Sequence, residues 1–304
     1  MSSLEVTRIL VAIADPSVGT SSIVRRAGAL AHAAGATIEL LNAIPSAMSG
    51  GPAHAHAERF VRFEADQNRR SLERIANRLR REELIVEATV QTGYPAHEAI
   101  LRQARLKKAD LVVIEARKHR IFARLLLTQT DFELIRHCPV PLLIVKGRAA
   151  WRRPRILAAL DPFHANDKPL GLDDRIVEAA QAFAALTQGL VHAAHVYRPY
   201  VGEVLAVQAG AALLASDPAQ EKAFKAMISK RFAEVLRRFG IPSPRGHLVC
   251  GDPKFEIPAL ARSIRAGLVV MGAVSRTRLK RIFIGNTAEH VLDSLHCDVL
   301  IIKP

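Results

Sequence analysis

Short apolar runs alternate with amphipathic segments along the whole chain. In the first half the apolar runs have the length of strands, and the segments between them carry apolar residues at helical spacing. The runs are 8–15, 37–44, 86–93, 110–116 and 141–146, and the helical segments are 21–34, about 57–81, 95–109 and 131–137. Strands that alternate with helices build right-handed crossovers on a parallel sheet, and runs apolar on both sides are typical of strands buried on both faces. The first half is therefore predicted to be a five-stranded parallel α/β sheet.

The second half repeats this order. Its predicted strands are 155–161, 190–197, 246–252, 267–273 and 298–303, and its predicted helices are 173–188, 217–239, 255–266 and 286–295. Residues 110–146 can also be laid on 267–303 without a gap, which pairs Leu111 with Leu268 and Lys146 with Lys303. Self-similarity of this kind indicates a tandem duplication.

The length of 304 residues fits two folding units, because one hydrophobic core usually stops growing at about 250–300 residues. We predict a first domain over 1–147, a linker over 148–154 and a second domain over 155–304. A linker as short as RAAWRRP favours domains that pack together. Trp151 is expected to anchor it against one domain.

The net charge of +14 attracts phosphates, so nucleic acid, nucleotides and anionic lipid are all partners to consider. Most basic residues alternate with acids at helical spacing, which is typical of a solvated helix face and disfavours a nucleic-acid groove. No apolar stretch reaches the roughly 18 residues of a membrane span. The chain also starts without a basic segment ahead of its first apolar run, so we predict no signal peptide and a cytoplasmic location.

Catalytic and metal-binding patterns are not evident. The three cysteines are unclustered, which fits neither a disulfide framework nor a zinc site. His54 and His56 have the spacing of two metal ligands but lack acidic or thiol partners, so we predict a loop there. The sequence contains no nucleophile elbow, no P-loop and no G-x-G-x-x-G. We therefore predict no catalytic residue and no metal.

The segment GLVVMGAVSRTRLKRIFIGNTAEHVLDSLHCDVLIIKP resembles the C-terminal signature of the universal stress protein family. Nucleotide-binding members of that family carry Gly-x2-Gly-x9-Gly-Ser/Thr between the fourth strand and the fourth helix. Here the frame reads Gly272, Ser275, Gly285 and Asn286. Asp15 and Asp161 after the first strands, and HCPVPLLIVK at the end of the first half, extend the resemblance over essentially the whole chain, to the tandem-domain type.

This resemblance implies two flavodoxin-like domains of the adenine nucleotide alpha hydrolase type. They are expected to pack as an intramolecular pseudo-dimer in which strands 141–146 and 298–303 pair across the interface. Such pairing would also remove two open sheet edges that invite aggregation. An additional homodimer is left open.

The resemblance also implies a nucleotide site in the second half. Asp161 would face the ribose or adenine, and Val196 the adenine. Glycines at these positions let backbone N–H groups and a helix amino end approach a phosphate. Ser275 and Asn286 depart from the family pattern, and Thr287 could supply the hydroxyl instead. The alternative is structural, with Asn286 capping the helix and Glu289 completing a capping box.

The first half departs further from the pattern. Glu115 stands at the position of Gly272, and Thr128 at the position of Gly285. A carboxylate would then point at any phosphate, and the close backbone approach is lost. ATP or another adenine nucleotide is therefore predicted, if anywhere, only in the second half.

Residues 201–216 form a nearly uncharged segment with no equally apolar counterpart in the first half. Four interpretations stay open: a lid over a cleft, a pocket for an apolar ligand, a dimer surface, or an extra helix over its own core.

The function expected from these observations is that of a non-enzymatic cytoplasmic stress-response protein that acts through ligand or partner binding. Two alternatives are an ATP-binding sensor or slow ATPase that uses the second-half site, and a basic protein associated with nucleic acid.

Overall fold

The computed structural model describes residues 5–18, 22–45, 54–93, 95–116, 127–147, 149–163, 171–198, 218–272 and 286–303. The first half contains β1 (Arg8–Ala12), η1 (Pro16–Val18), α1 (Ser22–Ala34), β2 (Thr37–Ile44), α2 (His54–Arg81), β3 (Val86–Thr92), α3 (Ala96–Leu106), β4 (Leu111–Glu115), α4 (Gln129–His137) and β5 (Leu142–Val145). The second half contains β6 (Arg155–Leu160), α5 (Leu172–Thr187), β7 (Leu190–Tyr197), α6 (Pro218–Arg238), η3 (Ser243–Arg245), β8 (Gly246–Cys250), α7 (Pro253–Ser263), β9 (Ala266–Gly272), α8 (Asn286–Ser294) and β10 (Asp298–Ile302).

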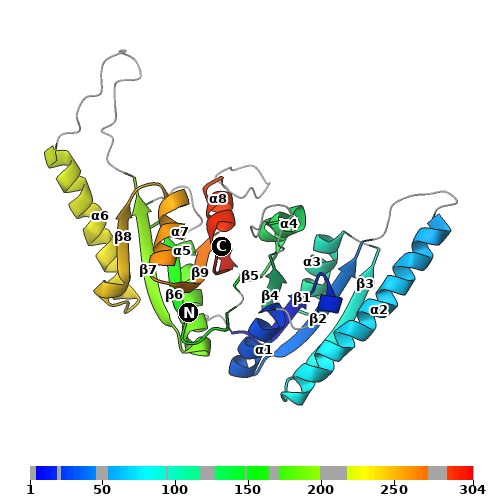
Figure 1. Ribbon diagram of the computed structural model, residues 1–304. Helices are drawn as coiled ribbons and strands as arrows, with labels where there is room; N and C mark the ends of the chain where they lie inside the picture. The colour runs from blue at the N-terminus through cyan, green and yellow to red at the C-terminus, as the bar shows by residue number, and fades with distance from the viewer. Residues whose placement is uncertain are drawn as a thin grey trace, which may run out of the picture.

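All strands join one ten-stranded sheet in the order β3-β2-β1-β4-β5-β10-β9-β6-β7-β8 (Figure 1). β5 and β10 pair antiparallel, with Leu143 opposite Leu300, and the strands within each half are parallel. The predicted α/β class and the pairing across the interface are confirmed. Within each half the third, second, first, fourth and fifth strands follow one another, whereas flavodoxin itself has the order 2-1-3-4-5. The point at which the strand order reverses therefore lies between β1 and β4, and between β6 and β9.

The duplication is visible in the bounds of the elements. The overlay that sets 110–146 on 267–303 brings α4 onto α8 residue for residue and β4 onto the last five residues of β9. A difference from the predicted bounds lies at α2, which begins at His54. The prediction of a loop at His54 and His56 was therefore wrong.

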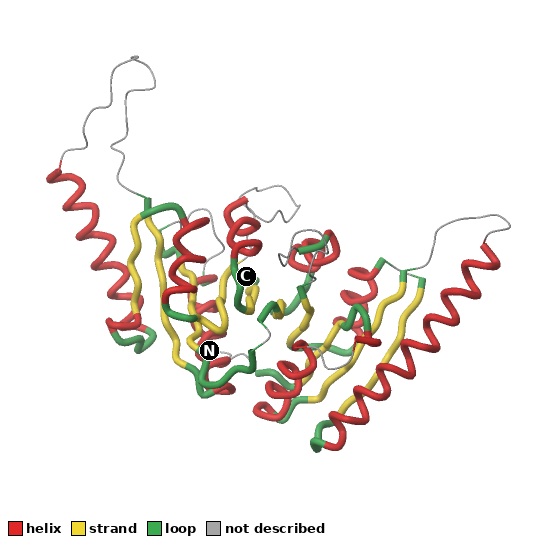
Figure 2. The backbone as a smooth tube through the Cα atoms, in the orientation of Figure 1, coloured by secondary structure: helices red, strands yellow, loops and turns green. Residues whose placement is uncertain are grey.

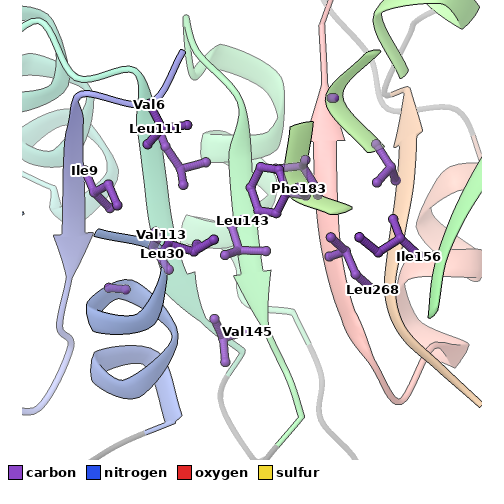
Figure 3. Packing of buried hydrophobic residues seen from close by; sticks show 14 of the residues in the cluster. Val6, Ile9, Leu30, Leu111, Val113, Leu143, Val145, Ile156, Phe183 and Leu268 are labelled. Atoms are coloured by element: carbon purple, nitrogen blue, oxygen red, sulfur yellow. The ribbon is translucent and has the colours of Figure 1, made fainter. Parts of the chain in front are cut away.

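The hydrophobic core is organised by sheet face and not by domain. One cluster contains alternate strand residues such as Ile9 and Ile156 together with helices α1, α2, α5 and α6. The other contains the intervening residues, such as Leu10 and Leu157, with helices α3, α4, α7 and α8. Side chains alternate between the faces of a strand, so each apolar run feeds both clusters. Figure 2 shows helices on both faces of the strands, and Figure 3 shows residues of both halves in the first cluster.

Two lysines at matching positions connect the halves, because each donates hydrogen bonds to carbonyl oxygens at the end of a helix in the other half. Nζ of Lys146, which follows β5, donates to the carbonyl oxygens of Leu292 and Leu295 at the end of α8. Nζ of Lys303, which follows β10, donates to the carbonyl oxygen of Arg136 in α4 at 2.7 Å. Lysines suit this place because the last carbonyls of a helix lack partners within the helix. Burial lowers the pKa of Lys146, and it lowers that of Lys303 to about 8.

We call the junction of the two halves at β5 and β10 the seam. An ion pair between Arg26 and Asp298, which has no symmetric counterpart, also connects the halves there. Asp298 is fully buried and accepts from Nε of Arg26 at 2.6 Å and from the backbone N–H groups of Lys146 and Gly147 at 2.8 and 2.7 Å. The Arg26 guanidinium also lies 4.6 Å from the ring of Trp151, which packs edge-on against Phe183 of α5. Trp151 thus anchors the segment between β5 and β6 against both halves. The sequence had predicted an anchor against one domain only.

Candidate functional site

Three of the predicted nucleotide-site residues meet at the carboxyl edge of the second half of the sheet. Asp161 directly follows β6, Val196 lies near the end of β7, and Gly272 ends β9. Leu160 pairs with His195, so Asp161 and Val196 are the next residues on neighbouring strands. Ligands of open α/β sheets bind outside the carboxyl ends of the strands where the order reverses, and β6 and β9 flank that point.

Asp161 is held by its neighbours while its carboxylate stays accessible. Its backbone N–H donates to Oδ1 of Asp173 at 3.2 Å, and its Oδ1 lies 3.9 Å from Nδ1 of the buried His195. That ring nitrogen also lies 3.2 Å from the carbonyl oxygen of Leu160. About a third of the Asp161 side chain is exposed, at 35%. A hydroxyl or amino group of a ligand could therefore reach it.

Gly272 has a packing reason to lack a side chain. A Cβ atom built there would lie 2.8 Å from Cδ2 of Leu172 and 3.5 Å from Cδ1 of Ile176, both in α5. The start of α5 therefore approaches β9 closely. In the first half Glu115 occupies the matching position, and its Oε1 accepts from the hydroxyl of Ser22, the first residue of α1, at 3.2 Å. There a carboxylate of the protein itself lies at the helix amino end.

The amino ends of α4 and α8 also differ by a carboxylate that is present in the first half. Thr128 and Asp131 form a capping box at α4, in which the Asp131 carboxylate accepts from N of Thr128 at 2.7 Å and the Asp131 N–H donates to Oγ1 of Thr128 at 3.3 Å. The matching residues in the second half are Gly285 and Ala288. Ala288 has no side-chain acceptor, so α8 lacks a carboxylate at the position that matches Asp131, and the acidic residue of its first turn is Glu289.

The remaining predicted residues are placed only in part. Ser275 and Gly285 lie outside the described residues, as does the apolar segment 201–216. Asn286 is the first residue of α8, whereas the capping prediction set it before the helix. Thr287 is half-buried in the first turn. Glu289, the predicted partner of Asn286, has its Oε1 3.9 Å from Nη2 of Arg136 in α4.

The amino end of α5 is less open to an anion. Asp173 and Asp174 both lie in its first turn. Acidic side chains there interact favourably with the helix dipole and would repel a phosphate. The first turn of α8 carries one acid, Glu289, whose Oε1 lies 3.9 Å from Nη2 of Arg136, so of these two helix ends α8 carries less negative charge.

A pair of histidines on β7 and β8 was not singled out from the sequence. Nδ1 of His192 lies 3.0 Å from Nε2 of His247, and the rings stack with centroids 5.3 Å apart. Burial and the neighbouring His247 lower the pKa of His192 to about 4, and burial lowers the pKa of His247. The only sequence signal is a histidine at a core position of a strand.

Two further observations concern the described part of the chain alone. Its His, Cys, Asp and Glu side chains do not assemble into a group of three or more that could hold a metal. Nor does it contain a helix that is both long and apolar enough to cross a membrane.

The model of the universal stress protein family matches residues 5–146 and 154–303. The chain therefore belongs to this family and carries two copies of its domain. It is 31% identical over 214 residues to universal stress protein E of Escherichia coli strain K12, a match that covers 68% of this chain and 65% of the relative. It is also 31% identical over 209 residues to the universal stress protein E homolog of Haemophilus influenzae, covering 68% of this chain and 66% of that protein.

Solved structures support the fold over the full length. A functionally unknown protein of Pseudomonas aeruginosa PAO1 matches with a TM-score of 0.76 at 22% identity, covering 99% of this chain and 94% of that one. A universal stress protein of Archaeoglobus fulgidus DSM 4304 matches with a TM-score of 0.68 at 18% identity, covering 100% and 99%. At these identities the likeness establishes the tandem architecture alone.

Proposed function

We propose that the protein is a non-enzymatic stress-response protein that acts by binding ligands or partners, and that its second half binds an adenine nucleotide such as ATP. The observation that carries the proposal is the replacement of Asp131 by Ala288 at matching helix ends. Backbone N–H groups at a helix amino end bind phosphate when no side chain of the protein competes for them.

The proposed contacts combine the described edge of the sheet with Ser275 and Gly285, two residues of the family motif that lie outside the described residues. The phosphates would lie at the start of α8, against backbone N–H groups of Gly285, Asn286 and Ser275, with the hydroxyl of Thr287 beside them. Gly272 keeps the end of β9 free of a side chain. Asp161 would accept from a ribose hydroxyl or the adenine amino group, and Val196 would contact the base.

Equilibrium binding of ATP, measured by titration calorimetry at 150 mM salt, tests the proposal. Ala288→Asp restores the carboxylate found at α4 and should weaken ATP binding by roughly tenfold or more, because it takes the N–H donors and adds negative charge. Gln67→Glu makes the same change of charge on an exposed position of α2 and should leave the affinity unchanged.

Two outcomes would contradict the proposal. One is no ATP affinity in the parent protein, and the other is an equal affinity in the parent and Ala288→Asp. Phosphate release from ATP and Mg²⁺ above the protein-free blank would contradict the non-enzymatic part alone. The domain limits at 147 and 155, the cytoplasmic location and a homodimer stay predictions.

A further inference from the structure

A groove of about 560 Å³ opens at the other edge of the sheet, away from the candidate nucleotide site. Its walls include the first residues of three strands, Arg155, Leu190 and Ala266. The segment 149–154 between the halves and residues 296–297 before β10 complete it. The groove thus lies where the two halves join.

Arginine dominates the wall of this groove. Arg26, Arg152, Arg153, Arg155 and Arg265 contribute to it, and no Asp or Glu is among the described residues that line it. Arg26 is paired with Asp298, and Nη1 of Arg155 donates to the carbonyl oxygen of Ile264. The other three are exposed and form no ion pair with any residue that the structure describes.

The backbone holds two of these arginines in an uncommon conformation. Arg153 has φ of 47° and Arg265 has φ of 51°, both in the left-handed region. A residue with a Cβ atom adopts this region at a cost in free energy, and Gly or Asn would occupy it more readily. Arg265 follows α7 as Lys108, with φ of 50°, follows α3 at the matching position, so this conformation of Arg265 belongs to the repeated fold.

We propose that this groove binds a compact phosphate of several negative charges, with the chemistry of a triphosphate chain. Guanidinium groups form paired hydrogen bonds with phosphate oxygens, and three of the arginines that line the groove form no ion pair with any described residue. The volume is that of a small-ligand pocket. The proposal stands independently of the nucleotide site in the second half, since it uses other residues on the opposite edge.

A nucleic acid fits the surface less well. α2, whose length would extend a positive track, carries four acids among its eight arginines. Three of these arginines form ion pairs within the helix: Arg62 with Glu58, Arg69 with Asp66 and Arg80 with Glu73. Binding along a strand needs positive charge that continues beyond one pocket. The groove differs from α2 in that no Asp or Glu is among the described residues that line it.

Binding of inorganic tripolyphosphate to the full chain, measured by calorimetry at 50 and 200 mM salt, tests the proposal. The double variant Arg152→Glu/Arg265→Glu should weaken binding by roughly a hundredfold, and Arg152→Lys/Arg265→Lys, which keeps the charge, by roughly tenfold. The control Arg59→Glu/Arg70→Glu makes the same charge change on exposed positions of α2 and should shift affinity less than about threefold after salt screening.

Ala288→Asp should keep the tripolyphosphate binding that the groove variants lose, which separates this proposal from the nucleotide site. Competition with ATP shows which ligand the groove prefers. If ATP and tripolyphosphate bind with equal affinity, the groove recognises the chain of phosphates alone. If ATP binds more tightly and this advantage is lost in the Lys variant, the groove binds a nucleotide. Circular dichroism checks that each variant folds. If the Glu variant does not fold, the affinity of the Lys variant tests the proposal.

Three results would overturn the proposal. They are no tripolyphosphate binding by the parent at 50 mM salt, an equal loss in the groove and α2 variants, and binding of a 20-nucleotide single strand in the groove without any binding of tripolyphosphate.

Discussion

The two halves of the molecule share their elements and strand order, yet they differ at matching positions around the carboxyl edge of the sheet. In the first half Glu115 and Asp131 place carboxylates at the ends of α1 and α4. In the second half Gly272 and Ala288 stand there. Single side chains therefore decide whether a copied backbone carries these two carboxylates at its helix ends.

A second difference lies on the face covered by α3 and α7. Oε1 of the buried Glu39 accepts from the Thr89 hydroxyl at 2.9 Å and from Nε2 of Gln103. Strand registers place His192 and His247 at the positions of Glu39 and Thr89. The same interior position thus holds a hydrogen-bonded carboxylate in one half and a neutral imidazole pair in the other.

The largest effect on the free energy of unfolding is expected at Asp298, where the seam differs between the two halves. Asp298 matches Pro141 of the first half, so its ion pair with Arg26 occurs once. Asp298→Ala leaves a buried guanidinium without its carboxylate and two backbone N–H groups without an acceptor. It should lower the free energy of unfolding by about 3–5 kcal/mol in urea denaturation.

The exposed pair of Asp66 and Arg69 provides the control. Asp66→Ala should cost about 0–1 kcal/mol, because water solvates both groups. If Asp298→Ala cost no more than Asp66→Ala, the buried pair would not stabilise the seam. The double variant Arg26→Met/Asp298→Ala should lose less than the two single losses combined, since no charge is left unpaired.

The histidine pair predicts a pH dependence that the first half lacks. The folded pKa of His192, at about 4, lies below its unfolded value of about 6.5, so the unfolded chain binds more protons. Stability is then complete above pH 6.5 and falls as the pH drops toward 4, by on the order of 2–3 kcal/mol. Carboxylates titrate in the same range.

For that reason the measurement is a difference between two proteins. Urea denaturation of the parent and of His192→Leu should give curves that converge as the pH falls from 7.5 to 4.5. Parallel curves over this range would show that His192 is protonated equally in the folded and unfolded chain.

The smallest expected effect concerns the closed end of α4. Thr128→Ala removes the hydroxyl of the capping box and should cost about 1 kcal/mol. Thr128→Ser retains the acceptor and serves as the control. Hydrogen exchange of the first-turn amides of α4 should accelerate in the Ala variant alone, and unchanged exchange would assign no stabilising role to this box.

Local patterns predicted the elements closely because each buried strand is a continuous apolar run. Strands 37–44 and 190–197 were predicted to the residue, and the repeat identified the two halves. The candidate site was predicted only in outline. Asp161, Val196 and Gly272 do meet at one edge, but no local signal showed that Asp131 closes α4 while Ala288 leaves α8 without that carboxylate.

The sequence also did not predict the Asp298 ion pair or the arginine groove. Their members lie far apart in the sequence, and only the seam brings Arg26, Trp151 and Asp298 together. A charged residue at the start of the apolar strand DVLII was the one signal that a buried partner was needed.

The sequence by itself determined the order of strands and helices, the duplication and the family, because these follow from local periodicity and from residues repeated at fixed positions. The tertiary structure decided how the two copies share one interior. Pairing of β5 with β10 turns two sheets into one, so the apolar side chains form one cluster on each face and not one in each domain. Burial and hydrogen bonding between distant residues depend on that arrangement in space, and for this reason no single segment of the chain reveals them.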